Sequence, residues 1–476
     1  MPSLLQPQYL FGLARKNARR AWLNYGFFWF GAVLVGLLAV LFARWSDMAQ
    51  KQFFHWIAGR AWLALLITPT LTALCVWLTR KFFVGSEGSG IPQVIAAMHS
   101  PRRRQLIPGL FGLRIIIGKI GVGLLGLMAG LTIGREGPTV HIGASVMYEM
   151  RRFYPRVSPR LERSLLLAGA AAGLSGAFNT PLAGVVFAIE EIARSFESRT
   201  NGTLITAIVV SGLVSVALAG NYLYFGQINA SITPSASFVF PVVFASVLCG
   251  AAGGIFNLLV LRQKRWIPQR LQGIRATKPL VWGAGLGLLI AVVGIASGGE
   301  TWGSGYDQAR ALLMDQKETV GYFYPVAKLV TMVLTYIAGT PAGLFSPSLS
   351  IGAGFGHAAS ALFPGASASA IVAVCMVGYL AAVTQSPLTS FIIVMEMING
   401  SSLLIPLMAT ALISSRVANF FTPPLYDALA LQNYGSVSEE AASPEEELVP
   451  PNEDAVLVAE DVVQPDRTTD DQGPAR

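Results

Sequence analysis

Long runs of apolar residues, separated by short polar stretches, make up most of this chain. The clearest runs are residues 25–42, 61–78, 106–133, 204–218, 239–261 and 280–296. A helix needs about 20 apolar residues to span the roughly 30 Å hydrocarbon core of a bilayer. The composition agrees, since 53% of the residues are hydrophobic, 13% are charged and the mean hydropathy is +0.55. The pattern predicts an all-α polytopic membrane protein and excludes an ordinary soluble domain.

The two ends of the chain depart from this pattern. Residues 1–24 interleave basic residues with Leu, Phe and Trp and lack the features of a cleavable signal peptide. They predict a cytoplasmic amphipathic helix on the membrane surface. Residues 436–476 are rich in Glu, Asp, Pro and Ser. Because such a segment has little apolar surface to bury, we expect a disordered acidic cytoplasmic tail, too short to hold a pair of regulatory domains.

Basic residues are distributed by membrane side. The net charge is +8, but lysine and arginine gather in separate short clusters, which does not favour a nucleic-acid partner. The clusters are residues 15–20, 80–81, 102–104, 151–163 and 262–278. Residues 44–60, 219–237 and 298–320 hold few basic residues and are interpreted as loops on the other side. Because basic loops stay in the cytoplasm, we expect these clusters and the N-terminus inside, most simply in a bacterial inner membrane.

Cysteine and histidine give no sign of a metal or redox site. The cysteines lie far apart within apolar runs, and the histidines lack the spacing of metal ligands. The residues concerned are Cys75, Cys249, Cys375, His55, His99, His141 and His357. We therefore expect no disulfide framework, no metal and no cofactor.

Part of the sequence occurs twice. The aligned segments are residues 134–144 with 343–353, and residues 179–182 with 385–388. The first pair shares Gly, Pro, a hydroxyl residue and a final Ile-Gly-Ala, and the second pair shares Pro-Leu. We expect two transmembrane halves built on one plan, over residues 25–219 and 237–432. Interrupted apolar segments at matching places in two halves indicate a substrate site formed by broken helices near the membrane midplane.

Each repeated Gly-x-x-x-Pro element predicts a chain break followed by a helix start. Glycine tolerates unusual backbone angles, and proline suits the first turn of a helix. Free N–H groups and the positive end of the helix dipole then point at the break, which favours an anion. The alternative is that Gly and Pro only kink and pack the helices. The duplication favours the anion site.

Four motifs carry a family resemblance. They are Gly88-Ser89-Gly90-Ile91-Pro92, Gly134-Arg135-Glu136-Gly137-Pro138, Gly343-Leu344-Phe345-Ser346-Pro347 and Pro424-Leu425-Tyr426. The first is glycine-rich but lacks the Lys-Ser/Thr ending of a phosphate loop. In this order the motifs resemble the CLC family of chloride channels and chloride/proton antiporters, over residues 15–432. The third motif ends Phe-Ser-Pro where many members have Phe-Ala-Pro or Phe-Val-Pro, a change that we expect to be conservative.

The resemblance implies a fold and a chloride site. The fold would be an inverted repeat of two halves with broken and re-entrant helices, assembled as a homodimer with one ion pathway per subunit. The hydroxyl groups of Ser89 and Tyr426 and the backbone N–H groups of Leu344 and Phe345 would bind chloride. Such dipoles hold an anion without a full positive charge, so the ion can leave again.

Glu136 is the strongest candidate for a functional side chain. A carboxylate at a helix start inside a membrane is costly unless it is paired or used. When ionised, it can occupy the anion site as a tethered substitute for chloride. When protonated, it loses that attraction and swings aside. This exchange would couple anion occupancy to proton transfer, so Glu136 is predicted to gate the site and carry the proton.

The repeat separates two neighbouring glutamates. Glu190 aligns with Glu396, which predicts packing or helix capping shared by both halves, whereas Glu191 aligns with Met397. In the CLC family that this chain resembles, a glutamate at the position of Glu191 passes protons on the cytoplasmic side of exchangers. Glu136 and Glu191 together favour chloride/proton antiport, with a passive chloride channel as the alternative.

Other polar residues permit other hypotheses. Lys119 and Lys328 lie in apolar runs, where they could tune the anion potential or pair with nearby carbonyl groups. The Gly-Leu-Ser-Gly at 173–176 resembles intramembrane serine proteases, with Ser175 as nucleophile and His357 as base. Helix packing by small residues explains the same pattern. We expect a transporter and not an enzyme.

Overall fold

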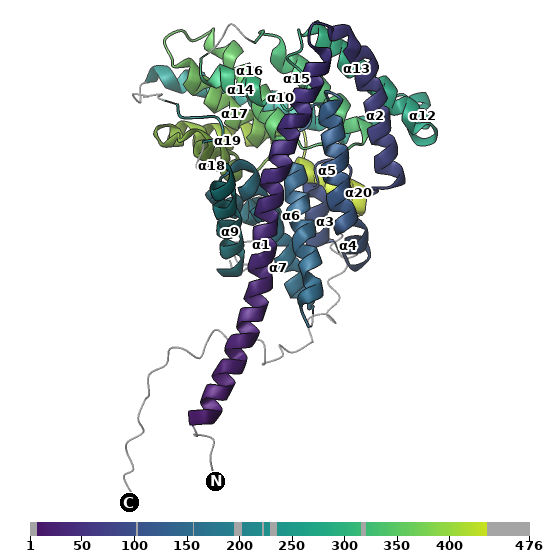
Figure 1. The fold of residues 1–476 in the computed structure, drawn as a ribbon. Coiled ribbons are helices and arrows are strands. Elements are labelled where there is room, and N and C mark those ends of the chain that lie inside the picture. Colours follow the sequence, from purple (N-terminus) through teal and green to yellow (C-terminus); the bar gives the residue numbers. More distant parts are fainter. Residues whose placement is uncertain are drawn as a thin grey trace, which may run out of the picture. The chain divides into compact units, whose positions relative to one another are not determined.

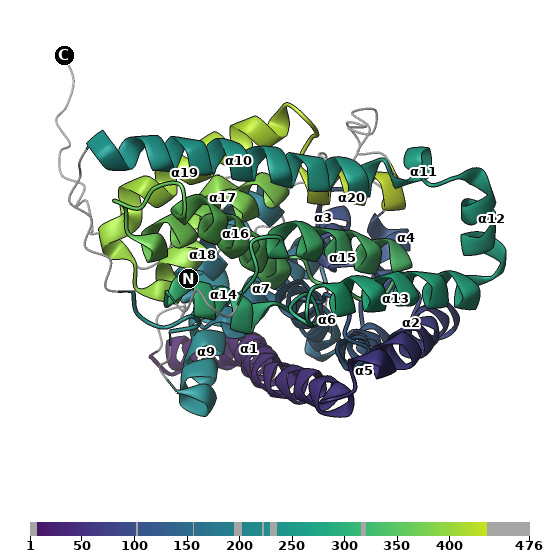
Figure 2. The same ribbon diagram turned by 90° about the horizontal axis from the view of Figure 1, so that it is seen from above.

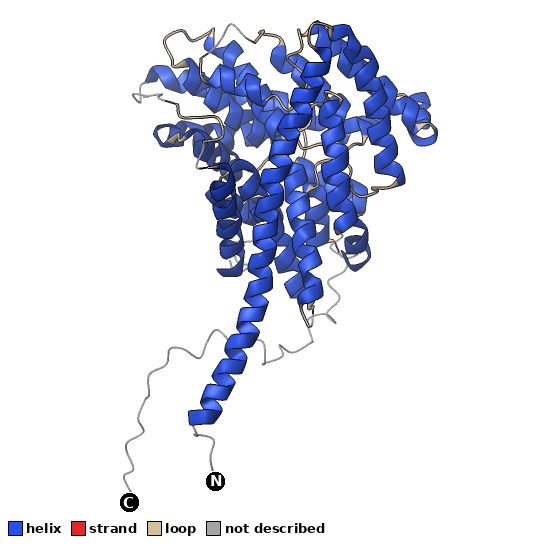
Figure 3. Ribbon diagram, viewed as in Figure 1, coloured by secondary structure: helices blue, strands red, loops and turns tan. Residues whose placement is uncertain are grey.

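The computed structural model describes residues 7–100, 103–155, 157–194, 202–220, 223–228, 236–315 and 320–435. Within these ranges the chain is helical and has no strand, as Figure 3 shows. The predicted all-α architecture is confirmed. The predicted acidic tail at 436–476 lies outside the described residues, as do residues 1–6 of the predicted N-terminal helix.

Helices of the first half run from α1 to α9. They are α1 (Pro7–Ile57), α2 (Ala64–Lys81), α3 (Ile91–His99), α4 (Arg103–Leu110), α5 (Leu113–Met128), α6 (Glu136–Met150), α7 (Pro159–Phe178), α8 (Pro181–Phe187) and α9 (Gly202–Ala219). Short 3₁₀ helices lie at η1 (Ala61–Leu63) and η2 (Arg151–Phe153), and a π-helix, η3 (Ala188–Ala193), continues α8.

Helices of the second half follow the same order. They are α10 (Ala236–Leu261), α11 (Gln263–Trp266), α12 (Gln269–Thr277), α13 (Pro279–Ala296), α14 (Tyr306–Leu313), α15 (Tyr324–Ala338), α16 (Phe345–Ser360), α17 (Ala368–Thr384), α18 (Pro387–Ile398), α19 (Leu404–Asn419) and α20 (Leu425–Tyr434), with a 3₁₀ turn, η5 (Ser401–Leu403). Equivalent helices make equivalent contacts: α6 packs on α7 as α16 packs on α17, and α1 packs on α9 as α10 packs on α19. Figure 2 shows α1 and α10 at opposite edges with these central helices between them.

Six helical stretches within the described residues are long and apolar enough to cross a membrane. They are Gly26–Ile57, Ala61–Lys81, Gln105–Met128, Val239–Leu261, Pro279–Ala296 and Ser401–Asn419. Several other apolar helices, including α15, α17 and α18, are shorter than a full span. Broken backbone at membrane depth is tolerated only where protein surrounds it. Of these short helices α17 is almost wholly buried, whereas α15 is buried on one face and exposes Val326 and Val330 on the other.

The first span is longer than the sequence pattern predicted. Residues 44–60 were expected to be a loop, but α1 continues to Ile57 as one helix (Figure 1). Ala49, Phe53 and Ile57 are buried at four-residue spacing, and that apolar stripe keeps the polar stretch helical. The same helix begins at Pro7, so the predicted surface helix and the first span are continuous in the described backbone.

Close helix crossings hold the central helices in place. A Cβ added at Gly143 of α6 would lie 2.2 Å from the carbonyl oxygen of Gly169 in α7. In the second half, a Cβ added at Gly352 of α16 would lie 2.5 Å from the carbonyl oxygen of Cys375 in α17. Small residues let membrane helices approach closely. The two crossings fix where α6 and α16 begin, and both helices begin at the candidate site.

Candidate functional site

The three glycine-containing breaks meet one another through backbone hydrogen bonds. Gly134 and Gly343 each donate their N–H group to the other's carbonyl oxygen, at 2.9 and 3.1 Å. Gly88 donates to the Thr340 carbonyl at 3.0 Å and accepts from the Ala342 N–H at 3.0 Å. Segments from both halves are therefore joined at a single point, and α3, α6 and α16 all start there.

The motif residues occupy the breaks and the first turns that follow. Gly90, in the left-handed region with a φ of 100°, precedes Ile91 and Pro92 at the start of α3. Pro138 and Pro347 lie in the first turns of α6 and α16. A Cβ at Gly137 would lie 2.3 Å from the Ser89 hydroxyl oxygen, so only glycine allows the first two motifs to approach this closely.

Two buried hydroxyl groups face this meeting point without a hydrogen-bond partner. The hydroxyl oxygens of Ser89 and Tyr426 are fully buried, and neither is bonded within the described residues. They lie near one another, and the Tyr426 ring stacks on Phe345 with ring centres 6.4 Å apart. Leu344 and Phe345 form the start of α16. Buried hydroxyl groups are rarely left unpaired, so this arrangement suits a bound polar species.

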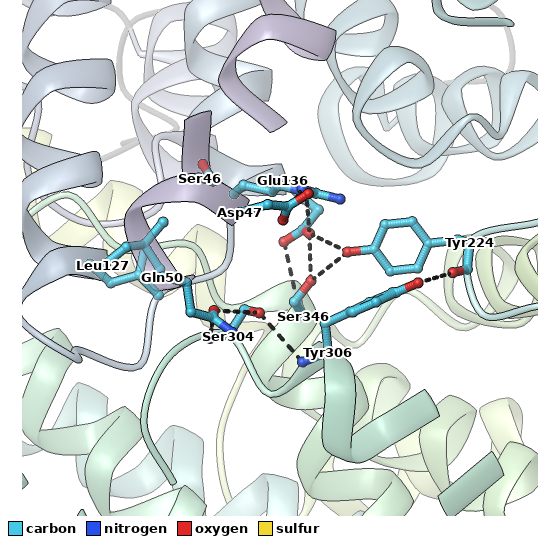
Figure 4. A pocket seen from close by; sticks show the side chains of 11 residues that line it. Ser46, Asp47, Gln50, Leu127, Glu136, Tyr224, Ser304, Tyr306 and Ser346 are labelled. Carbon is cyan, nitrogen blue, oxygen red and sulfur yellow. Dashed lines mark hydrogen bonds and ion pairs between the residues drawn. The ribbon is translucent and has the colours of Figure 1, made fainter. Parts of the chain in front are cut away.

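The Glu136 carboxylate lies at the start of α16, in the opposite half. It is fully buried, and its Oε2 accepts the Ser346 backbone N–H at 3.3 Å. Its Oε1 accepts the Ser346 hydroxyl at 2.5 Å and the Tyr224 hydroxyl at 3.3 Å. Figure 4 shows both hydroxyl groups directed at the carboxylate. A negative group therefore sits where the N-terminus of α16 favours an anion.

Two neighbouring cavities lie close to Glu136, and the smaller one is lined by its carboxylate. A cavity of about 20 Å³, room for about one water molecule, lies against the carboxylate. Its lining is Ser46, Asp47, Gln50, Leu127, Ile133, Arg135, Glu136, Tyr224, Ser304, Tyr306 and Ser346 (Figure 4). A second, larger cavity shares several of these residues and adds Arg44, Lys51 and Asp307. Glu136 thus lines this cavity and also bonds to the start of α16.

Charges around these two cavities are mixed. Arg135 donates to the Asp47 carboxylate at 2.9 Å, and its Nε lies 4.0 Å from Oε1 of Glu136. Burial raises the pKa of the Asp307 carboxyl and the Asp47 charge raises it further, while Lys51 and Arg310 oppose the shift. The cavity therefore loses negative charge at a less acidic pH than an exposed aspartate would require.

Glu191 is the second candidate acid near Tyr426. It is buried in η3, where its Oε2 accepts the Ser386 hydroxyl and its Oε1 has no hydrogen-bond partner within the described residues. The Tyr426 hydroxyl is within electrostatic range of both Glu191 and Glu136. Arg194, at the end of η3, forms an ion pair with Asp427, the residue after Tyr426. Both candidate acids thus lie in the neighbourhood of the Tyr426 hydroxyl group.

Comparison with known proteins identifies the family. Residues 71–419 match the family model described as voltage gated chloride channel. The chain is also 30% identical over 431 residues to the H(+)/Cl(-) exchange transporter ClcA of Salmonella agona (strain SL483), covering 86% of this chain and 88% of that protein. The chain belongs to the CLC family of voltage gated chloride channels. It is therefore an integral membrane protein of a transport family.

Solved CLC structures share the fold. A slow cyanobacterial Cl-/H+ antiporter matches with a TM-score of 0.71 at 24% identity, covering 85% of this chain and 97% of the other. A CLC-type fluoride/proton antiporter matches with a TM-score of 0.71 at 19% identity, covering 84% and 96%. These likenesses confirm the predicted CLC-type inverted repeat with broken and re-entrant helices.

The repeat in the sequence predicted packing or helix capping for both Glu190 and Glu396, and helix capping is confirmed. Glu190 accepts the backbone N–H groups of Leu388 and Thr389, at 3.0 and 2.6 Å, at the start of α18. Glu396 accepts those of Leu182 and Ala183, at 3.3 and 2.8 Å, at the start of α8. Each half therefore caps a helix of the other, and the shared glutamate has a structural role.

The buried lysines of the CLC fold pair with carbonyl oxygens. Lys119 donates to Gly88 at 2.8 Å, and Lys328 donates to Thr301 and Gly303 at 2.7 and 2.8 Å. The sequence permitted two interpretations of these lysines, tuning of the anion potential or pairing with nearby carbonyl groups. The observed bonds agree with the second. Among the described residues, neither lysine is hydrogen-bonded to the Ser89 or Tyr426 hydroxyl, so their direct effect is on the loops before α3 and α14.

Sequence reasoning missed residues on the outer side of this CLC site. A second Gly-Ser-Gly, at residues 303–305, repeats that of residues 88–90. It precedes α14 as the first copy precedes α3. That second Gly-Ser-Gly was visible in the sequence. The contacts of Ser346 and Tyr224 with Glu136 were not, because no sequence pattern brings residue 224 near residue 136. The change to Ser346 is therefore not conservative, since its hydroxyl group bonds to Glu136.

The two residues of the protease hypothesis make separate packing contacts in the CLC chain. The Ser175 hydroxyl donates to the Ile208 carbonyl at 3.4 Å, in the packing of α7 against α9. The His357 ring stacks on Tyr322 with centres 4.8 Å apart. Among the described residues, no group of three or more His, Cys, Asp or Glu side chains is placed to hold a metal ion.

Proposed function

We propose that this protein exchanges chloride for protons across the membrane. The position of the Glu136 carboxylate at the start of α16 carries the proposal, because an ionised side chain there competes directly with an anion. The exchange named for the Salmonella agona relative supports it. Protonation of Glu136 removes the ionised group that competes with chloride, so proton binding and chloride binding at this site are coupled.

Chloride would bind where the three breaks meet. The hydroxyl groups of Ser89 and Tyr426 would donate to the ion, together with the backbone N–H groups of Leu344 and Phe345. Support comes from the two buried hydroxyl groups that lack a partner among the described residues. Hydroxyl and amide dipoles compensate for lost hydration without trapping the ion as a lysine or arginine would.

Protons would pass between Glu191 and Glu136 in the direction opposite to chloride. Glu191 would receive them on the cytoplasmic side, and Glu136 would carry them past the anion site to the outer cavity. The supporting observation is that both acids are buried and that the Tyr426 hydroxyl lies within electrostatic range of each. A passive chloride channel would not need a buried acid at position 191.

The organisation expected from the sequence completes the proposal. Each subunit of a homodimer would hold one pathway, formed between the halves at 25–219 and 237–432. The protein would lie in a bacterial inner membrane with both termini in the cytoplasm. The arrangement of the basic clusters supports this orientation.

A liposome assay tests the exchange directly. Purified protein is reconstituted into vesicles loaded with chloride, diluted into low chloride at equal pH, and external pH is recorded. In an antiporter, the outward chloride gradient drives protons uphill into the vesicles, even when a potassium ionophore clamps the membrane potential. Chloride efflux without this proton uptake would assign the protein as a channel, and no chloride efflux would contradict both functions.

A further inference from the structure

Two hydroxyl groups hold the Glu136 carboxylate in place. The Ser346 hydroxyl donates to Oε1 at 2.5 Å, and the Tyr224 hydroxyl donates to the same oxygen at 3.3 Å. The two hydroxyl groups are also 3.3 Å from one another. We refer to Ser346 and Tyr224 as the hydroxyl pair. Ser346 stands where alanine or valine is expected in many members of the family, and neither of those residues could supply this hydroxyl group.

Tyr224 is fixed for this role. It lies in the described segment 223–228 between the two halves, and its carbonyl oxygen accepts the Tyr306 hydroxyl at 2.7 Å. Its ring packs edge-on against Tyr306 and Phe178, with ring centres 5.0 and 5.4 Å apart. The side chain is buried, and Figure 4 shows its hydroxyl group pointing at Glu136. Tyr224 therefore presents its hydroxyl group to the carboxylate from a fixed position.

The geometry suits a carboxylate better than a halide. Oε1 receives the hydroxyl pair, while Oε2 receives the Ser346 backbone N–H. A carboxylate fills both positions with its two oxygens, whereas one spherical ion fills only one. Hydroxyl groups that donate to an ionised oxygen also form stronger bonds than those to neutral acceptors. These bonds thus favour the ionised form of Glu136 over its protonated form, and the two-point geometry favours the carboxylate over chloride in this position.

We propose that Ser346 and Tyr224 hold the Glu136 carboxylate in the anion position, and so weaken chloride binding and slow the opening of the outer gate. The effect on gating rests on the proposed exchange function. The effect on chloride affinity requires only that chloride and the carboxylate compete. These two consequences can be measured separately.

Equilibrium chloride binding tests the competition. Chloride is titrated calorimetrically into the purified full-length protein in detergent, for wild type, Ser346→Ala and Tyr224→Phe. We expect Ser346→Ala to tighten chloride binding by roughly tenfold and Tyr224→Phe, whose bond is longer, by roughly threefold. The matched controls are Ser360→Ala, at the opposite end of α16 from Glu136, and Tyr379→Phe, whose ring stacks on Phe355 in α16; both should leave chloride affinity unchanged. Unchanged or weaker binding in both test variants would overturn the proposal.

A second background identifies the group through which the pair acts. In Glu136→Ala, the carboxylate is absent, so adding Ser346→Ala should leave chloride affinity unchanged. If affinity falls there as much as it rises in the native background, the hydroxyl group binds the anion itself and the proposal is wrong. Both substitutions shorten side chains without adding bulk. Thermal unfolding of each variant confirms that it is folded.

Transport measurements separate this inference from the proposed function. In liposomes, Ser346→Ala should exchange chloride and protons roughly tenfold faster at an unchanged ratio, because the outer gate opens more easily. If wild type moves chloride without protons, the proposed exchange fails while the calorimetric comparison still decides the role of the hydroxyl pair. If wild type exchanges both ions and Ser346→Ala is no faster, the gating role is refuted alone.

Discussion

The two halves of the molecule share a framework and differ at the acids. Glu190 and Glu396 cap each other's helices, and the breaks at Gly134 and Gly343 bond to one another. Positions shared by both halves therefore build and join the scaffold. At the aligned positions of Glu136 and Glu191, only the first half has a carboxyl group. The difference teaches that repetition marks structure in this chain, while departures from it mark the candidate chemistry.

Both candidate proton carriers are such departures. In the sequence alignment of the two halves, Glu136 aligns with Phe345, and Glu191 aligns with Met397. Phe345 helps to form the start of α16, toward which Glu136 points. One half thus supplies the carboxylate and the other supplies the helix start that receives it. A fully symmetric molecule would have two helix starts and no tethered anion.

The segment around Glu191 also departs from the repeat in its backbone. In the first half, the left-handed residue Arg194 comes four residues after the capping glutamate, whereas Asn399 in the second half comes three residues after it. The extra residue is accommodated as the π-helix η3, in which the Arg194 N–H reaches the Ile189 carbonyl at 2.9 Å. Single π turns often occur at functional sites. Here the π turn contains Glu191.

The matched serines show the same division. The Ser304 N–H and hydroxyl groups both donate to Oε1 of Gln50, at 3.0 and 3.3 Å. The Ser89 hydroxyl has no such partner among the described residues. The serine of one Gly-Ser-Gly loop is therefore hydrogen-bonded to α1. Among the described residues, the hydroxyl group of the other serine has no partner and is available to a ligand.

Removing the acid at position 136 should have the largest effect. Glu136→Gln cannot ionise or release a proton, so proton uptake should fall to that of protein-free liposomes while chloride still moves. Simultaneous recording of pH and chloride in the liposome assay checks this. Glu162→Gln, at a partly buried acid in α7 paired with Arg151 at the start of η2, serves as control. Coupled proton uptake in Glu136→Gln would contradict the contrast between the halves.

Next in size is the contrast between neighbouring glutamates. Glu191→Gln should abolish proton uptake with chloride efflux retained, because the buried acid cannot pass a proton on. Glu190→Gln keeps an oxygen that can accept from the start of α18, so its proton-to-chloride ratio should match wild type. The same liposome assay measures both. Equal loss of coupling in the two variants would assign the proton route to both residues.

The reciprocal caps should affect stability rather than coupling. Glu190→Ala and Glu396→Ala each leave two backbone N–H groups without their acceptor, at a cost of about 1–3 kcal/mol. We expect each variant to unfold at a lower temperature in detergent while its proton-to-chloride ratio is unchanged. Because α8 and α18 are in contact, the double variant should lose less than the sum of the single losses. A strictly additive loss would show that the two caps are independent.

The smallest effect concerns the paired serines. Ser89→Ala removes an expected ligand and should weaken chloride binding roughly tenfold, or about 1.4 kcal/mol. Ser304→Ala removes a hydroxyl group already bonded to Gln50 and should change affinity by less than about twofold. Calorimetric titration with chloride measures both. Equal losses would mean that the outer loop also contacts the ion.

The sequence predicted the framework well because its signals are local or repeated. Apolar runs indicated the spans, and the Gly-x-x-x-Pro elements indicated the helix starts. The alignment of Glu190 with Glu396 predicted shared capping, which the hydrogen bonds confirm. Predictions failed where burial on one face overrode polarity, as in residues 44–57 of α1. The assigned roles of Ser89, Tyr426, Glu136 and Glu191 stay predictions until transport and binding are measured.

The amino-acid sequence by itself determined the helical membrane class, the duplication and the identity of the buried acids. These follow from hydropathy and from residue order along the chain. Only the tertiary structure decided that Glu136 reaches the opposite half, that Tyr224 and Ser346 bond to it, and that Ser89 stays open while Ser304 is closed. Such contacts join residues far apart in sequence, and packing between helices, rather than any local pattern, brings their side chains within bonding distance.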